Sequence, residues 1–280
     1  MQFFFVSDLH GNAQKYEKLY TYVLTRNPQA VFFGGDLLPS ISSNNEDIPS
    51  FINNTIFSPL ERIKKSIPDI QFFFILGNDD PRRYESIFLE ADKKQLISYV
   101  HEKTVTFLDF FVTGYAYVPP TPFQLKDCER YDVSRFVDVG GVSPEQGAFS
   151  VPIDINSIRF KTMKNDLDEL VKNAPASKTI FLFHSPPYDT NLDRAELNGK
   201  KIDHVPLDVH IGSIAIKRFI SEYQPFITLH GHVHESSQIT GNWQQTFEKT
   251  ISFSAAYHGD ELAVIVVDTD NPQKADRIML

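Results

Sequence analysis

The sequence predicts an α/β protein, a layered domain built around a largely parallel β-sheet. Apolar runs of strand length alternate with helix-like patterns through the first hundred residues, and this alternation is typical of that fold class. Of the 280 residues, 41% are hydrophobic and 13% aromatic, which is enough to bury a sizeable core. The sequence contains no internal repeat and no long polar linker, so we expect residues 1–280 to form a single domain.

The first six predicted elements alternate strand and helix. In order, they are strand Gln2–Ser7, helix 12–26, strand Ala30–Phe33, a short helix from Ser58, strand Gln71–Leu76 and a helix from Pro81 into the nineties. Helix 12–26 carries its apolar residues on one face and should stop before Pro28, because the residue before a proline avoids the helical conformation. We expect Ser58 to be an N-cap, with Pro59 in the first helical position.

The second half of the chain is richer in strands. Strands are expected at Thr104–Leu108, Phe110–Gly114, Thr179–Phe183, Phe226–Leu229, Ile251–Ser254 and Leu262–Val267, the last ones antiparallel, and helices at Lys164–Lys172 and Ser213–Tyr223. Three segments show no periodicity: Leu38–Phe57, Val118–Ser150 and Ser185–Gly212 (38–57, 118–150 and 185–212). Structureless loops of that length are usually lids or binding loops.

Charge and cysteine content exclude several classes of protein. With 36 acidic and 27 basic side chains, the formal charge is -9, which argues against a nucleic-acid partner because phosphate-backbone binding needs concentrated Lys and Arg. The single cysteine, Cys128, excludes an intramolecular disulfide and a Cys-rich zinc site, and favours a reducing compartment. The first residues lack a basic leader and the longest apolar runs have strand length, so we expect a cytoplasmic protein without a membrane partner.

Five apolar strands are each followed by residues that can bind a metal ion. The pairs are Phe3–Val6 with Asp8 and His10, Val31–Phe33 with Asp36, Phe72–Leu76 with Asn78, Phe181–Phe183 with His184, and Ile227–Leu229 with His230, His232 and His234. A lone Asp or Asn at such a place is more often a turn former. However, the carboxyl ends of strands in an α/β sheet share one crevice, and these side chains together form a mixed oxygen and nitrogen ligand set. The pattern therefore predicts a metal cluster.

The same residues resemble the motifs of the calcineurin-like metallophosphoesterases. The family pattern of D-x-H, G-D, G-N-H-D/E, H and G-H-x-H is matched in order by Asp8-Leu9-His10, Gly35-Asp36, Gly77-Asn78-Asp79-Asp80, His184 and Gly231-His232-Val233-His234. The resemblance covers nearly the whole chain, and residues 185–187 and 210–213 look like the compact prokaryotic members. It implies a four-layer αββα sandwich of two mixed sheets flanked by helices, with the metal site at the carboxyl ends of the strands.

The resemblance also implies a site for two divalent ions, which would be manganese, iron, nickel or zinc. Asp8, His10, Asp36 and His234 would hold one ion, and Asp36, Asn78, His184 and His232 would hold the other. A bridging carboxylate such as Asp36 can hold two ions about 3.5–4 Å apart, the spacing that clamps the attacking and leaving oxygens of a phosphoryl group. A metal-bridging hydroxide is then the expected nucleophile, and hydrolysis of phosphodiesters, with monoesters as the alternative, is the expected activity.

One position departs from the family pattern. The family usually carries a histidine after G-N, where it is thought to protonate the leaving group, and this chain has Asp79. An Asp beside two dications is held ionised and makes a poor proton donor, so we expect substrates with good leaving groups. His210 or His204 on the 185–212 loop could supply the proton instead; the competing interpretation of both is an exposed loop histidine.

Further residues near the blocks are candidates for substrate binding. Asn12 opens a helix whose free N–H groups suit a phosphate oxygen, and Arg82 or Arg83 could bind a phosphate bidentately. A solvated helix face is an equally good interpretation. His230 is out of phase with His232, and we interpret it as a packed residue at a strand end.

Two other functional classes remain as alternatives. A non-enzymatic metal-binding scaffold with the same fold is supported by Asp79 and opposed by the presence of every metal ligand of the pattern. A nuclease is disfavoured by the acidic charge. We expect a small phosphorylated substrate as the partner and leave a homo-oligomer open.

Overall fold

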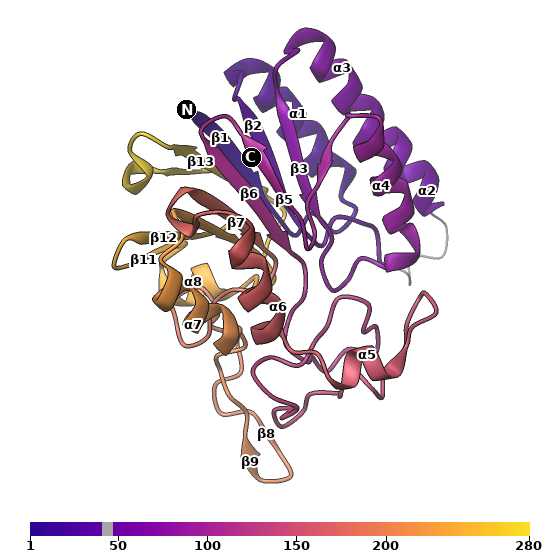
Figure 1. Ribbon diagram of the computed structural model, residues 1–280, viewed down its shortest axis with the longest axis vertical. Helices are drawn as coiled ribbons and strands as arrows, with labels where there is room; N and C mark the ends of the chain where they lie inside the picture. Colours follow the sequence, from indigo (N-terminus) through magenta and orange to yellow (C-terminus); the bar gives the residue numbers. More distant parts are fainter. Residues whose placement is uncertain (41–46) are drawn as a thin grey trace.

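The protein is a four-layer α/β structure in which two mixed sheets pack face to face between helices (Figure 1). The computed structural model describes residues 1–40 and 47–280. The first sheet contains, in spatial order, β14 (Asp276–Met279), β13 (Ala263–Asp268), β1 (Gln2–Val6), β2 (Ala30–Gly34), β3 (Gln71–Ile75) and β4 (Ser98–Tyr99). The second contains β11 (Gln244–Phe247), β12 (Thr250–Ser254), β10 (Ile227–His230), β7 (Thr179–Phe183), β6 (Phe110–Tyr115) and β5 (Thr104–Phe107).

Helices cover the outer faces of both sheets. Helices α1 (Ala13–Arg26), α3 (Ser58–Ser66) and α4 (Glu85–Lys93) lie against the first sheet, and α6 (Met163–Leu170) and α7 (Ile214–Tyr223) lie beside the second (Figure 1). The short elements are α2 (Ile48–Phe51), α5 (Ile155–Arg159) and α8 (Ser236–Thr240), the 3-10 turns η2 (Arg82–Tyr84), η3 (Val171–Asn173), η4 (Ala176–Lys178) and η5 (Pro272–Lys274), and the π-helix η1 (Ile52–Phe57). The predicted αββα sandwich is confirmed.

Every strand expected from the sequence is present within about two residues of its predicted bounds. Sequence reasoning missed β4, β11 and β14, which are edge strands of the two sheets. It also missed the two-residue strands β8 (Lys201–Ile202) and β9 (Val205–Pro206), which form a separate hairpin. Edge strands contact the core on one side only, so they carry little of the continuous apolar pattern that marks a central strand.

The helix around Pro59 begins earlier than predicted. Residues 48–66 form one helical run, so Ser58 lies inside it and is not an N-cap, and the loop expected over 38–57 is wrong for residues 48–57. Pro59 has no N–H to donate to the carbonyl of Thr55 four residues back; that carbonyl accepts the Tyr20 hydroxyl at 3.0 Å instead. Ser58 N–H donates to Asn53 five residues back, a π-turn. The part of the expected loop at 41–46 lies outside the described residues.

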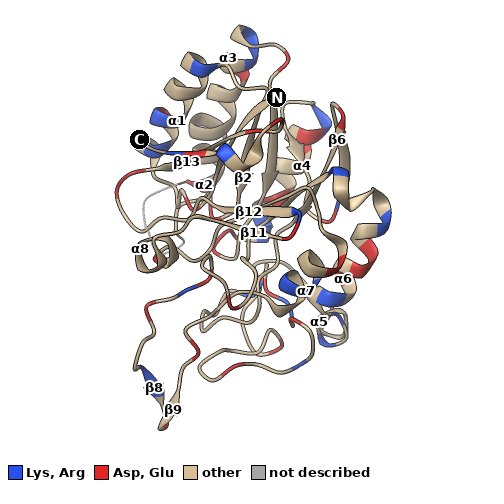
Figure 2. Ribbon diagram, turned by 90° about the vertical axis from the view of Figure 1, so that its left-hand side faces the viewer, with Lys and Arg blue, Asp and Glu red and all other residues tan. Residues whose placement is uncertain are grey.

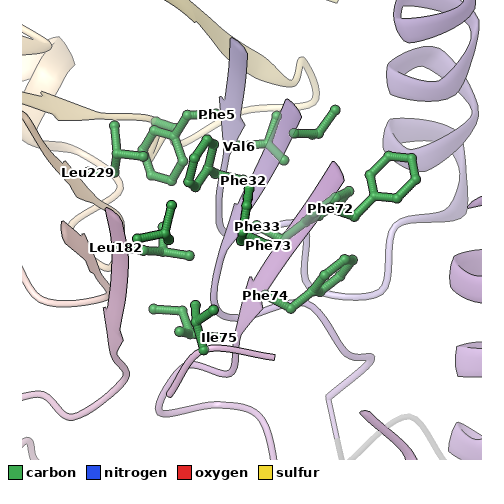
Figure 3. Close-up of a cluster of buried hydrophobic side chains, with 14 of the residues drawn as sticks. Phe5, Val6, Phe32, Phe33, Phe72, Phe73, Phe74, Ile75, Leu182 and Leu229 are labelled. Atoms are coloured by element: carbon green, nitrogen blue, oxygen red, sulfur yellow. The ribbon is translucent and has the colours of Figure 1, made fainter. Parts of the chain in front are cut away.

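The core between the sheets is built from consecutive aromatic residues that face opposite ways. Phe32 stacks on Phe73 and both contact Phe107 of the second sheet, whereas Phe33 stacks on Phe74, which contacts Phe88 of α4. Figure 3 shows Leu182 and Leu229 of the second sheet facing Phe5 and Phe32. Because both faces of the first sheet are buried, its central strands read as unbroken apolar runs.

The two remaining long segments follow the expectation. Residues 118–150 contain isolated β-bridges but no helix or strand, and residues 185–212 contain the β8–β9 hairpin together with isolated bridges at Pro187 and between Arg194 and His210. Figures 1 and 2 both show this hairpin extending away from the sheets. Within the described residues, no helix is long and apolar enough to cross a membrane.

Candidate metal centre

The seven predicted metal ligands lie on loops that leave neighbouring parallel strands of both sheets. Strands β1, β2 and β3 pair in parallel in the first sheet, and β7 and β10 pair in parallel in the second. The loops that follow them therefore emerge at a common end of the sandwich. The ladder of backbone hydrogen bonds continues into two of these loops, where Asp8 N donates to Gly35 O at 3.0 Å and His10 N donates to Asp36 O at 2.8 Å.

Four of these ligands have a left-handed backbone. The φ angles are +58° for Asp8, +44° for His10, +53° for Asp36 and +74° for His232. Residues other than glycine adopt this region at a cost of about 1–3 kcal/mol, and such residues cluster at functional sites. The left-handed turns bend the chain sharply after each strand, so that the side chains point back toward one another.

The first ligand group joins the loops after β1, β2 and β10. One ligand atom from each of Asp8, His10, Asp36 and His234 lies within 4.8 Å of all the others. The Nε2 atoms of His10 and His234 are 3.1 Å apart, and Asp8 Oδ1 is 3.2 Å from His234 Nε2. The carboxylate of Asp8 is held by the hydroxyl of Ser7 and by the backbone N–H of His232.

The second ligand group shares Asp36 with the first. Ligand atoms of Asp36, His184 and His232 lie within 4.8 Å of one another. His184 Nε2 is 3.2 Å from Asp36 Oδ2 and 3.1 Å from Asn78 Oδ1, which brings the predicted amide ligand to the same point. All seven predicted ligands thus meet at the place where a two-ion site is expected.

The donor set fits divalent cations. His184 Nδ1 lies 2.7 Å from Gly34 O and must donate its proton there, so Nε2 is the ring atom that faces the oxygens of Asp36 and Asn78. Burial by itself would lower the pKa of His184, but the charge of Asp36 raises it to about 10. Burial together with the charge of His184 lowers the pKa of His232 to about 3. Asp36 thus attracts a positive charge to His184 Nε2. That charge is a proton or a divalent cation, and the cation would displace the proton and be bound by the neutral ring, as it would by the neutral ring of His232.

The carboxylates of the cluster are ionised. Burial by itself would raise the pKa of Asp8, but the hydrogen bond and charge of His234 lower it to about 2. Burial opposes ionisation of Asp36 in the same way, and the charge of His184 holds its pKa well below the usual range. Two ionised carboxylates facing four imidazoles form the charge pattern that a pair of divalent cations requires.

The loop after β3 approaches Asp36 closely. Asp79 N donates to Asp36 Oδ1 at 2.8 Å, and a Cβ atom on Gly77 would collide with the Asp36 carboxylate. The side chain of Asp79 is 49% exposed, and its Oδ2 is 3.6 Å from His10 Nδ1. Burial and the charge of Asp36 raise the pKa of Asp79. Asp79 thus lies beside the ligands on the accessible side of the cluster, where the resemblance placed it.

The other predicted residues lie outside this cluster or are engaged elsewhere. His210 Nδ1 is 2.8 Å from Asp193 and its Nε2 is 3.6 Å from Asp189, and both partners belong to its own loop. His204 is exposed in the β8–β9 hairpin, which extends away from the sheets, and this placement contradicts a role for His204 as proton donor. A catalytic role for His210 stays a prediction.

The two predicted substrate-binding residues have protein partners. The side-chain oxygen of Asn12 caps α1 by accepting from Gln14 N and Lys15 N, which leaves only its amide N–H₂ for a ligand. The guanidinium of Arg82 donates to Glu85 through both Nε and Nη2 at 3.2 Å. Substrate binding by Asn12 and Arg82 also stays a prediction.

His230 is a packed residue at the end of β10, as interpreted from the sequence. Its ring stacks on Phe183, and its nitrogens contact Ser185 O at 2.9 Å and Thr228 Oγ1 at 2.8 Å. Burial lowers its pKa to about 4, so the ring is neutral at physiological pH.

Sequence reasoning missed Asp80 as a residue of the site. Asp80 is fully buried and accepts backbone hydrogen bonds from Leu37 at 2.9 Å, Leu38 at 2.8 Å and Gly77 at 2.9 Å. It thereby ties the loop that carries Asp36 to the loop that carries Asn78. The only signal in the sequence was its place in the motif Gly77-Asn78-Asp79-Asp80.

Comparisons with known proteins agree with this architecture. The family model described as calcineurin-like phosphoesterase matches residues 1–236. No curated protein matches the sequence significantly. Among solved structures, the fold is similar to TT1561 of Thermus thermophilus, with a TM-score of 0.57 and 13% identity over 99% of this chain and 98% of that chain.

Two further structures share the fold. A dimetal phosphatase from Danio rerio has a TM-score of 0.58 and 12% identity over 95% of this chain and 91% of that chain. The phosphopantetheinyl hydrolase from Mycobacterium tuberculosis has a TM-score of 0.51 and 10% identity over 91% of this chain and 89% of that chain. At these identities the likeness concerns the fold alone.

Proposed function

The chain belongs to the calcineurin-like phosphoesterase family, and we propose that it hydrolyses phosphate esters with the help of two divalent ions. The observation that carries the proposal is the sharing of Asp36 between two ligand groups, since a shared carboxylate is what a two-ion site requires. The similar structure from Danio rerio is described as a dimetal phosphatase, which supports two ions over one.

The residues that would hold the ions are the seven already described. Asp8, His10, Asp36 and His234 would bind one ion, and Asp36, Asn78, His184 and His232 the other. Once bound, the ions would polarise the phosphoryl group and lower the pKa of a water molecule, which is why the proposal needs no Ser or Cys nucleophile.

The exposure of the ligands indicates from which side a substrate arrives. Asp36 and His184 are buried, whereas the side chains of His10, His234 and Asp79 are about one quarter to one half exposed. A phosphate ester therefore reaches the site across His10 and Asp79.

The carboxylate of Asp79 then favours some esters over others. It repels a dianionic monoester more strongly than a monoanionic diester, and cations nearby hold it ionised, so it protonates a leaving group poorly. We therefore propose that diesters with good leaving groups are preferred over alkyl monoesters.

The partner that this site fits is a small phosphorylated molecule. Figure 2 shows Lys and Arg on several separate elements, interspersed with Asp and Glu. In this view, the described residues show no continuous basic stripe of the kind that tracks a nucleic-acid backbone.

The experiment that tests the proposal is an activity screen on metal-free protein. Chromogenic aryl diesters and alkyl and aryl monoesters are assayed after Mn²⁺, Zn²⁺, Ni²⁺ or Mg²⁺ is added back. We expect hydrolysis that depends on added metal and is fastest with the aryl diesters. Hydrolysis that survives complete metal removal would contradict the proposal.

A second candidate function is a metal-binding scaffold without activity. The observation that favours it is Asp79, which occupies the position where the family usually has its proton-donating histidine. The two candidates differ in the same screen: a scaffold binds two ions per chain and hydrolyses none of the esters with any metal.

A further inference from the structure

The loop that carries Asn78 and Asp79 is held at both of its ends by buried carboxylates. We call residues 77–83 the Asn78 loop. At its start, Asp80 accepts the backbone N–H of Gly77. At its end, the N–H groups of Arg82 and Arg83 donate to Asp127 Oδ2 at 2.8 Å and to Ser150 Oγ at 3.0 Å. The first anchor belongs to the loop itself, whereas the second is supplied by a distant part of the chain.

Asp127 and Ser150 form one unit. Ser150 N donates to Asp127 Oδ1 at 2.9 Å, and the Ser150 hydroxyl donates to Asp127 Oδ2. The side chain of Asp127 is buried, and these bonds together with the one from Arg82 satisfy both of its oxygens. Hydrogen bonds from N–H groups to an ionised carboxylate are about twice as strong as those between neutral groups.

Both residues belong to the segment 118–150, which has no regular secondary structure and was expected to be a lid or binding loop. We call it the 118–150 lobe. The turn that presents Asp127 is fixed by its two flanks, because Lys126 Nζ donates to Glu129 Oε2 at 2.6 Å and to Thr121 O at 2.8 Å, with the Lys126 and Glu129 side chains fully buried. The end of the Asn78 loop is therefore fixed relative to the 118–150 lobe by the hydrogen bonds of Asp127 and Ser150.

We propose that Asp127 and Ser150 are positioning residues through which the 118–150 lobe sets the placement of Asn78 and Asp79. Arg82 is only four residues beyond Asn78, and Asp80 fixes the opposite end, so the backbone between the two anchors has little freedom. The lobe is then a clamp on the metal site and not a freely moving lid. The inference rests on the proposed function in one respect only, the role of Asn78 as a metal ligand.

The test compares Asp127→Ala with the unmodified full-length protein. Mn²⁺ affinity and stoichiometry are measured by titration calorimetry, and amide hydrogen exchange is followed in the peptide that contains Arg82 and Arg83. We expect Mn²⁺ to bind about 10- to 100-fold more weakly, as is typical when a residue behind a metal ligand is lost. We also expect the amides of Arg82 and Arg83 to lose protection, and kcat for an aryl diester to fall more than KM rises.

Asp132→Ala is the matched control. Asp132 lies in the same lobe and accepts from Ser213 Oγ at 2.6 Å, Ile214 N at 2.7 Å and Ala215 N at 3.0 Å. Its bonds tie the lobe to the start of α7 and not to the Asn78 loop. Both variants should lower the melting temperature of the metal-free protein, but only Asp127→Ala should weaken Mn²⁺ binding and expose the two amides.

Two results would overturn the inference: equal weakening of Mn²⁺ binding in both variants, or unchanged Mn²⁺ affinity in Asp127→Ala despite a lower melting temperature. If Asp127→Ala does not fold, Ser150→Ala removes one bond to the Asn78 loop and should show smaller changes of the same kind; no change in Mn²⁺ affinity or in exchange at Arg83 would again overturn it. Failure of the proposed function would give a different result, because the unmodified protein would then bind Mn²⁺ without hydrolysing any ester. The comparison of Mn²⁺ affinity between Asp127→Ala and Asp132→Ala would still test the inference.

Discussion

Asp80→Ala should destabilise the protein far more than truncation of the adjacent residue, Asp79. Asp80 accepts three buried backbone N–H groups, from Leu37, Leu38 and Gly77. A buried donor that loses its partner costs about 1–3 kcal/mol, so the loss of all three is worth about 3–6 kcal/mol even if water partly refills the space. Because typical domains are stable by only about 5–15 kcal/mol, such a loss removes a large part of the free energy of unfolding.

The conservative variant sharpens this prediction. In Asp80→Asn the remaining side-chain oxygen can still accept from Leu37 and Leu38, since Asp80 Oδ1 serves both, but the new amide N–H₂ faces the N–H of Gly77. We therefore expect Asp80→Asn to cost about 1–3 kcal/mol, less than Asp80→Ala.

Urea unfolding of metal-free protein measures both variants, with Asp79→Ala as the control. Asp79 is the adjacent residue, half exposed, and its side chain accepts no backbone hydrogen bond among those described, so its truncation should change the free energy of unfolding by less than about 1 kcal/mol. If Asp80→Ala cost no more than Asp79→Ala, the account of Asp80 as the tie between the two ligand loops would be wrong.

Three further predictions concern the ligands, the leaving group and a buried ion pair. Asp36→Ala should abolish activity and the tight binding of both ions, whereas His230→Ala should lower stability only; equal metal loss by elemental analysis in the two variants would refute this distinction. Asp79→His should raise turnover of an alkyl monoester relative to an aryl diester, because positioned proton transfer is worth about 10²–10⁴ in rate, and a parallel fall of kcat/KM for both esters would make Asp79 a bracing residue instead. Burial raises the pKa of Glu129 from 4.5 to about 7, so the stability that its proton contributes is present below about pH 4.5 and lost as the pH rises to about 7. Thermal melting of metal-free protein should therefore show that the free energy of unfolding of Glu129→Gln rises by about 1–3 kcal/mol relative to that of the unmodified protein between pH 5 and pH 8. If the difference between the two proteins did not change with pH, the raised pKa of Glu129 would be wrong.

The sequence predicted the central strands and the metal ligands for the same physical reason. Strands such as β2 and β3 are buried on both faces, so their apolar runs are continuous and end sharply where the first polar residue leaves the sheet. The ligands are those first polar residues or their near neighbours. A strand end is therefore visible in the sequence at the same point as the ligand it carries.

The parts that could not be predicted depend on backbone groups that only the folded chain brings together. Asp80 and Asp127 bind N–H groups 43 and 45 residues away, which no local pattern records. The helical run through Pro59 depends on Tyr20, which takes the carbonyl that the proline leaves free. In each case a side chain satisfies a distant backbone group, and the sequence shows the side chain without its partner.

Hydrogen bonds between the ligand loops explain why several ligands keep a left-handed backbone. Asp8, His10 and Asp36 keep costly backbone conformations because their loops are bonded to each other, through Asp8 N to Gly35 O and His10 N to Asp36 O, and because Asp80 holds the residues that follow Asp36. These bonds join backbone groups and the Asp80 carboxylate, none of which belongs to the predicted ligand atoms, so they restrain the ligand backbone independently of what the ligand side chains bind. Binding of an ion to such restrained ligands should cost little free energy for reorganisation of the chain. The unfavourable left-handed backbone of the ligands is offset by the stability of the two sheets.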